Sequence, residues 1–157
     1  QFMRAMPNTS SKFNLGITAI FNATFKEGNL KKVKKLFKNV GIVLELDKEN
    51  KIDVFTGMIG SGPAYFFYLL KSYQKKLMYL CHSDQKMVND VMVNLIKGVG
   101  SSIEHNQDLD ELIATVASKR VTTEAGLNSF KSLKLNKSFE DGINAAIQRS
   151  KEISNEF

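Results

Sequence analysis

Residues 60–70 read Gly60-Ser61-Gly62-Pro63-Ala64-Tyr65-Phe66-Phe67-Tyr68-Leu69-Leu70. The small residues interrupt one helix, and Pro63 fits the first turn of the next, where its missing N–H would have no partner. Residues 66–70 are all apolar or aromatic, so at ~100° per residue they point around the whole helix. Such a helix needs neighbours on every side, and a second copy of the chain is the expected neighbour. The sequence therefore predicts a helical homodimer.

Helical periodicity continues from about residue 49 to the end of the chain, and Asp84, Asp108 and Thr122 are the expected N-caps of three helices. The first part is mixed, with strand candidates at residues 16–21 and 42–46 on either side of a helix. Strand, helix and strand in this length are the size of one βαβ unit. We expect a mainly α fold, in which a small α/β remnant of a Rossmann-type domain (residues 1–47) precedes a helical domain (residues 48–157).

The composition is globular, with 43% hydrophobic residues, 24% charged residues and a formal net charge of +6. The single cysteine, Cys81, excludes an intrachain disulfide and favours a reducing, cytoplasmic setting. No apolar run approaches the roughly 18 residues that span a bilayer, so no membrane partner is expected. His82 and His105 have no cysteine or carboxylate at ligand spacing, so we predict no metal site. Because residue 1 is Gln rather than Met, we expect a fragment of a longer protein.

The best candidate for small-molecule chemistry is a loop with two adjacent threonines, Ser118-Lys119-Arg120-Val121-Thr122-Thr123-Glu124-Ala125-Gly126-Leu127. The backbone N–H groups of a helix start lack internal partners and carry partial positive charge, so they can hold a carboxylate. The two threonine hydroxyls can donate hydrogen bonds to the same ligand. The alternative is a capped connection between helices. Ser61 has the same two interpretations, as part of a pocket lining or of a kink that allows close packing.

A strongly basic segment lies earlier in the chain, where five lysines fall within eight residues: Lys31, Lys32, Lys34, Lys35 and Lys38. Such a run is typical of a solvated helix face. Few aromatic residues are interleaved with it, which weakens the case for nucleic-acid binding. We therefore do not expect a nucleic-acid partner.

Three segments, in order and spacing, resemble motifs of the pyrroline-5-carboxylate reductases. Residues 4–9 resemble R-x-M-P-N-T, residues 56–65 resemble T-x-x-S-G-S-G-P-A-Y with Ile59 in place of a serine, and residues 118–127 resemble S-P/K-G-G-T-T-x-A-G-L. The resemblance covers essentially the whole chain. It implies reduction of Δ1-pyrroline-5-carboxylate to L-proline with NADPH or NADH, the last step of proline synthesis. It also implies subunits whose Rossmann domain precedes a helical domain that interlocks into a homodimer, with higher oligomers as an option.

The resemblance also assigns roles to residues. The dinucleotide-binding glycine loop belongs upstream of this chain, so the fragment alone is expected to be inactive. Thr123 takes the catalytic role, with its hydroxyl near the imine nitrogen of the imino-acid substrate. The implied substrate-binding residues are Ser118, Val121, Thr122, Thr123 and Ser61, and the implied cofactor-binding residues, near the nicotinamide, are Asn8 and Thr9.

The chain departs from the family motif at Arg120 and Val121, which stand where the family has two glycines. Glycine permits a positive φ that valine strongly disfavours, so the loop has another shape or substrate binding is impaired. Arg120 could instead pair directly with the substrate carboxylate. A second interpretation is therefore a catalytically degenerate homologue that acts as a dimeric scaffold. A third is a basic helical module, for which salt-dependent binding to generic DNA would be evidence.

Overall fold

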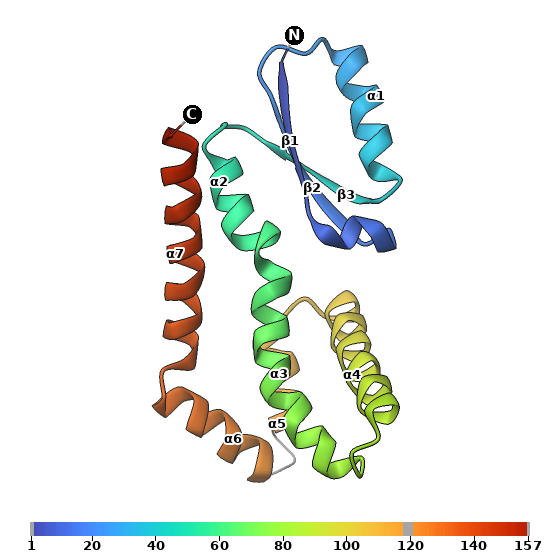
Figure 1. The fold of residues 1–157 in the computed structure, drawn as a ribbon, viewed down its shortest axis with the longest axis vertical. Helices are drawn as coiled ribbons and strands as arrows, with labels where there is room; N and C mark the ends of the chain where they lie inside the picture. The colour runs from blue at the N-terminus through green and yellow to red at the C-terminus, as the bar shows by residue number, and fades with distance from the viewer. Residues whose placement is uncertain (1, 118–120, 157) are drawn as a thin grey trace. The chain divides into compact units, whose positions relative to one another are not determined.

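The computed structural model describes residues 2–117 and 121–156 (Figure 1). The chain divides into two compact units, an α/β unit of residues 1–65 and 139–157 and a helical unit of residues 66–138. The mainly α fold with a small α/β part is as predicted. In chain order the elements are β1 (Met3–Pro7), the 3-10 helix η1 (Thr9–Phe13), β2 (Gly16–Asn22), α1 (Glu27–Lys38), β3 (Gly41–Leu46), α2 (Lys51–Phe55), the π-helical turn η2 (Thr56–Gly60), α3 (Gly62–Leu80), α4 (Gln85–His105), α5 (Leu109–Ala117), α6 (Val121–Ser132) and α7 (Leu135–Asn155).

The sheet of the α/β unit has the strand order β1-β2-β3. Strands β2 and β3 are parallel and are joined by α1, so the predicted βαβ unit is confirmed. Helix α1 lies against one face of the sheet, where Lys34 Nζ is 2.5 Å from Glu45 Oε2. Strand β1 was not predicted, because it has no β-branched run and ends in Pro7. Antiparallel pairing with β2 forms this strand, and a proline is tolerated at the end of an edge strand.

The C-terminal part of α7 packs against α2 and η2 (Figure 1). Two serines one helical turn apart, Ser150 and Ser154, both donate hydrogen bonds to Asp53 Oδ1, at 2.9 and 2.7 Å. These bonds satisfy a carboxylate that is buried in the α/β unit. Gly57 faces the backbone of Ile147 so closely that a Cβ on residue 57 would lie 2.7 Å from the Ile147 nitrogen. The packing of α7 therefore requires glycine at position 57.

Side-chain caps begin two helices of the helical unit as expected. Asp84 Oδ1 accepts the N–H groups of Lys86 and Met87 at 2.9 and 3.1 Å. Asp108 Oδ1 accepts the N–H groups of residues 110 and 111, both at 3.0 Å. The predicted cap at Thr122 is wrong, because α6 already begins at Val121 and places Thr122 inside the first turn.

The described part of the helical unit buries few apolar side chains, namely Leu77 and Val88. The aromatic run of α3 is open instead, with Phe67 68% and Tyr68 77% exposed. An exposed apolar surface of this kind marks a binding interface more often than a solvated face. The expectation that α3 needs a partner outside its own chain therefore stands.

Replacing Gly57 with alanine tests the close approach to α7. The added Cβ would meet Ile147 Cγ1 at 2.5 Å, so η2 or α7 must shift. We expect Gly57→Ala to lower the free energy of unfolding by ~1–3 kcal/mol, measured by chemical denaturation. Gly28→Ala on α1 is the matched control, because a Cβ there meets nothing within 4 Å, and it should leave stability equal or higher. Equal losses in the two variants would contradict the packing argument.

Candidate functional site

The predicted threonines lie in the first turn of α6. The backbone N–H groups at the start of a helix carry partial positive charge, so the first turn of α6 suits an anion. Thr122 is exposed and Thr123 is half-buried. Val121 is the first residue of α6, so its backbone is helical. Valine therefore does not have to adopt the positive φ that the family's glycine would permit at this position. Two other predicted positions of the loop, Ser118 and Arg120, lie outside the described residues.

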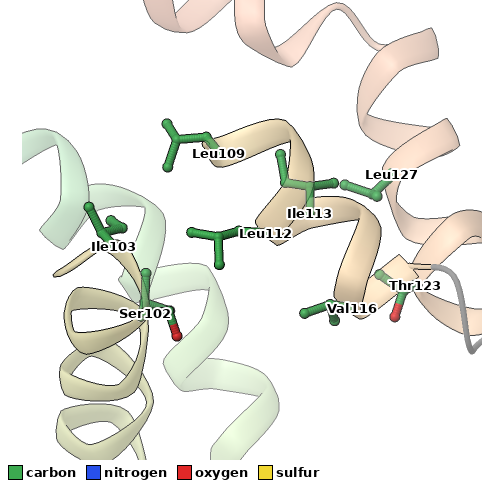
Figure 2. A pocket seen from close by; sticks show the side chains of 9 residues that line it. Ser102, Ile103, Leu109, Leu112, Ile113, Val116, Thr123 and Leu127 are labelled. Atoms are coloured by element: carbon green, nitrogen blue, oxygen red, sulfur yellow. The ribbon is translucent and has the colours of Figure 1, made fainter. Parts of the chain in front are cut away.

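Thr123 lines an open pocket of about 390 Å³ formed by residues of α4, α5 and α6. Figure 2 shows the α5 side chains between Thr123 on one side and Ser102 and Ile103 of α4 on the other. The complete lining is Val99, Ser102, Ile103, Leu109, Leu112, Ile113, Val116, Thr123 and Leu127. The helical unit therefore places the threonine predicted to be catalytic at the rim of an apolar pocket.

The chemistry of this pocket suits apolar groups. Ser102 Oγ already donates a hydrogen bond to the Gly98 carbonyl at 2.9 Å, so it is bound to its own helix. No charged side chain is among the described residues that line the pocket. A carboxylate is therefore better held by the N-terminal amides of α6 than by the pocket walls. Glu124, also in this first turn, adds a negative charge that opposes an anionic ligand.

The residues predicted to bind the cofactor, Asn8 and Thr9, lie at the carboxyl end of β1. Asn8 joins this end to β2, because its N–H donates to the Ile17 carbonyl at 3.1 Å and its Oδ1 accepts the Ile17 N–H at 3.0 Å. Thr9 is exposed and begins η1. Because β1 runs antiparallel to β2, this edge of the sheet is also where the parallel strands β2 and β3 begin. Asn8 therefore has a structural role in addition to the predicted one.

Ser61 directly follows the π-helical turn η2. Its N–H donates to the Thr56 carbonyl at 2.9 Å, and its carbonyl accepts the Ala64 N–H at 3.0 Å. The turn packs on β1, since a Cβ on Gly60 would lie 3.5 Å from Met6 Cε. The structure thus brings Ser61 into the same unit as Asn8 and Thr9, whereas the twin threonines belong to the helical unit.

Charged side chains tie the elements that surround this turn. Arg4 of β1 pairs with Glu49, just before α2, at 3.1 Å. Lys51 lies 2.6 Å from Asp47, and its hydrogen bond lowers the pKa of that carboxyl. Both pairs are exposed, so they contribute orientation more than stability.

The structure adds one polar contact that the sequence analysis missed. Tyr65 Oη donates a hydrogen bond to the Gly57 carbonyl at 2.7 Å, and the Tyr65 ring meets Phe139 edge-on with 6.1 Å between centroids. The sequence held part of the signal for this contact, since Tyr65 belongs to the second motif.

Among the described residues no group of three His, Cys, Asp or Glu side chains could hold a metal ion. None of the helices that residues 2–117 and 121–156 form is long and apolar enough to cross a membrane.

Comparison with known proteins identifies the family of the chain. The family model for pyrroline-5-carboxylate reductase dimerisation matches residues 49–153. The chain belongs to the pyrroline-5-carboxylate reductase family. It is similar to the pyrroline-5-carboxylate reductases of Staphylococcus haemolyticus and Staphylococcus aureus (strain COL), each 33% identical to it over 96% and 97% of the chain. It spans 56% of the length of each of these relatives.

Solved structures of pyrroline-5-carboxylate reductases have the same fold. The structure from Coxiella burnetii aligns with 96% of this chain and 56% of its own, with a TM-score of 0.84 and 28% identity. The Plasmodium falciparum structure, solved with NADP bound, aligns with 96% of this chain and 57% of its own, with a TM-score of 0.85. Its 24% identity makes it a likeness of fold alone.

The two hydrogen bonds between Asn8 and Ile17 predict the effect of substitution. Asn8→Ala removes the side-chain acceptor of the part-buried Ile17 N–H and should lower the free energy of unfolding by ~1–3 kcal/mol. Amide exchange at Ile17 should accelerate. Asn8→Asp keeps an acceptor oxygen and should preserve Ile17 protection. If Ile17 is as well protected in both variants as in the wild type, the Asn8 side chain does not hold the Ile17 N–H.

Proposed function

We propose that this chain is part of an enzyme that reduces Δ1-pyrroline-5-carboxylate to L-proline with NADPH or NADH. Residues 1–47 form the end of the cofactor domain, and residues 48–157 form the dimerisation and substrate-binding domain. The observation that carries the proposal is the twin-threonine start of α6 inside a segment that matches the family's dimerisation model. The single cysteine supports a cytoplasmic location.

The substrate offers a carboxylate and a cyclic imine to the protein. The amides of Thr122 and Thr123 in the first turn of α6 suit the carboxylate. The family resemblance adds Ser118, Val121 and Ser61 as substrate-binding residues. The Thr123 hydroxyl orients the imine nitrogen and relays a proton to it. A threonine hydroxyl does not titrate near neutrality, so it acts as a hydrogen-bond donor more than as a true acid.

The residues at the end of β1 fit the nicotinamide end of the cofactor. The first motif of the family resemblance assigns Asn8 and Thr9 to this role, and both directly follow the last residue of β1. The cofactor supplies the hydride when it is bound. The protein's part is to hold the imino acid so that its imine carbon faces that hydride.

Substitution of Thr123 in the full-length protein tests this role. Thr123→Ala should lower kcat by about 100-fold, the usual scale of a positioned proton donor. Thr123→Ser keeps the hydroxyl and is the matched control, so it should retain most of the turnover. The measurement is NADPH oxidation with Δ1-pyrroline-5-carboxylate. Unchanged turnover in Thr123→Ala would remove this residue from the mechanism.

We also propose that the functional form is a homodimer built by the helical unit. The exposed aromatic run of α3 and the apolar pocket formed by α4, α5 and α6 support this. Both are exposed apolar surfaces, and their burial in an interface would be favourable. Residues 66–70 point around the whole helix, so one chain cannot cover them all. An interface with such a core is typical of obligate dimers.

A pair of phenylalanines tests the location of the interface. Phe67 of α3 and Phe13 of η1 are 68% and 66% exposed, so replacement by glutamate changes a similar surface in each unit. Phe67→Glu should shift the mass measured by light scattering at micromolar concentration toward the monomer, since a charge in an apolar interface costs several kcal/mol. Phe13→Glu should leave the mass unchanged. A monomeric wild type would contradict the proposed dimer.

A further inference from the structure

The turn η2 departs from α-helical winding in a way that changes two hydrogen bonds. In an α-helix the Ser61 N–H would donate to the Gly57 carbonyl, four residues earlier. Here it donates to the Thr56 carbonyl, five residues earlier, at 2.9 Å. The Tyr65 hydroxyl takes the vacated place and donates to the Gly57 carbonyl at 2.7 Å. One side chain thus compensates for the hydrogen bond that the π-helical turn diverts.

The Tyr65 ring is itself held in place. It meets the Phe139 ring of α7 edge-on, at 6.1 Å and 83°. The Tyr65 hydroxyl binds the carbonyl of Gly57, and Gly57 faces the backbone of Ile147, which is also on α7. Tyr65 and Gly57 are therefore both fixed against α7, and the hydrogen bond between them has little freedom.

The turn lies between α7 and the strand that leads to Asn8. Gly60, the last residue of η2, lies close to Met6 of β1. Isolated π-helical turns inside α-helices are rare, and many occur at functional sites. This one ends directly before Ser61, a residue that the proposed function places on the substrate.

We propose that Tyr65 is a positioning residue for the imino-acid site. Its hydroxyl keeps η2 in π-helical winding and so fixes the direction of Ser61 relative to the end of β1. Without the hydroxyl, the Ser61 N–H can return to the Gly57 carbonyl, which winds the turn as an α-helix and rotates Ser61 away. Tyr65 acts through Ser61, because its own hydroxyl is engaged by Gly57. This role rests on the proposed reductase function.

Tyr65→Phe in the full-length protein removes only the hydroxyl. We expect the KM for Δ1-pyrroline-5-carboxylate to rise about tenfold, the scale of one neutral hydrogen bond, while the dissociation constant for NADPH stays within about twofold. Tyr79→Phe is the matched control, because Tyr79 is on the same helix and is 91% exposed. It should leave both constants unchanged.

A purely structural role for Tyr65 would lower stability without this split between the two constants. Replacement of Tyr65 by 4-aminophenylalanine, which keeps a donor at the same place, should restore the wild-type KM. If Tyr65→Phe folds poorly, the 4-aminophenylalanine variant alone tests the role of Tyr65. A KM that is still about tenfold above the wild-type value in that variant would show that a hydrogen-bond donor at this position does not determine the KM.

The outcomes separate this inference from the proposed function. A wild-type enzyme that reduces Δ1-pyrroline-5-carboxylate, with a raised KM in Tyr65→Phe and a restored KM in the aminophenylalanine variant, supports both. An active wild type with an unchanged KM in Tyr65→Phe overturns the role of Tyr65 and leaves the reductase in place. A full-length wild type without this activity overturns both.

Discussion

The close approach of Gly57 to Ile147 is the constraint on which the α/β unit depends. Because residue 57 has no side chain, the backbone of α7 can lie directly against η2. That distance places Ser150 and Ser154 within hydrogen-bonding reach of Asp53, whose buried carboxylate would otherwise lack compensation. The end of the chain thus completes the environment of a turn formed much earlier in the sequence.

The helical unit follows a different principle, since its apolar residues exceed what it buries. Full burial of one large apolar side chain contributes roughly 1.5–3 kcal/mol, so an open run such as residues 66–70 leaves a large stabilisation unrealised in a single chain. Association with a second copy would recover it. The pocket beside Thr123 is also lined mainly by apolar side chains.

The sequence predicted those features that depend on neighbouring residues. Asp84 caps α4 through amides two and three positions away, and the βαβ unit follows from periodicity within its own segments. Strand β1 could not be predicted, because β2 supplies its hydrogen bonds. The π-helical turn was not predicted, because residues 60–63 read as a simple helix break. Of the candidate site residues, Thr122 and Thr123 lie in the first turn of α6, although Thr122 is not its cap, whereas the contact made by Tyr65 needs the folded turn.

The start of α6 combines two opposing electrostatic effects. Its N-terminal end attracts an anion, since a helix N-terminus stabilises such a charge by roughly 0.3–1 kcal/mol at an exposed position. Glu124 in the same turn stabilises the helix by the same mechanism, so it would compete with an anionic ligand for the favourable potential. In the proposed carboxylate site, recognition would then rest on the geometry of the hydrogen bonds at this turn more than on net charge.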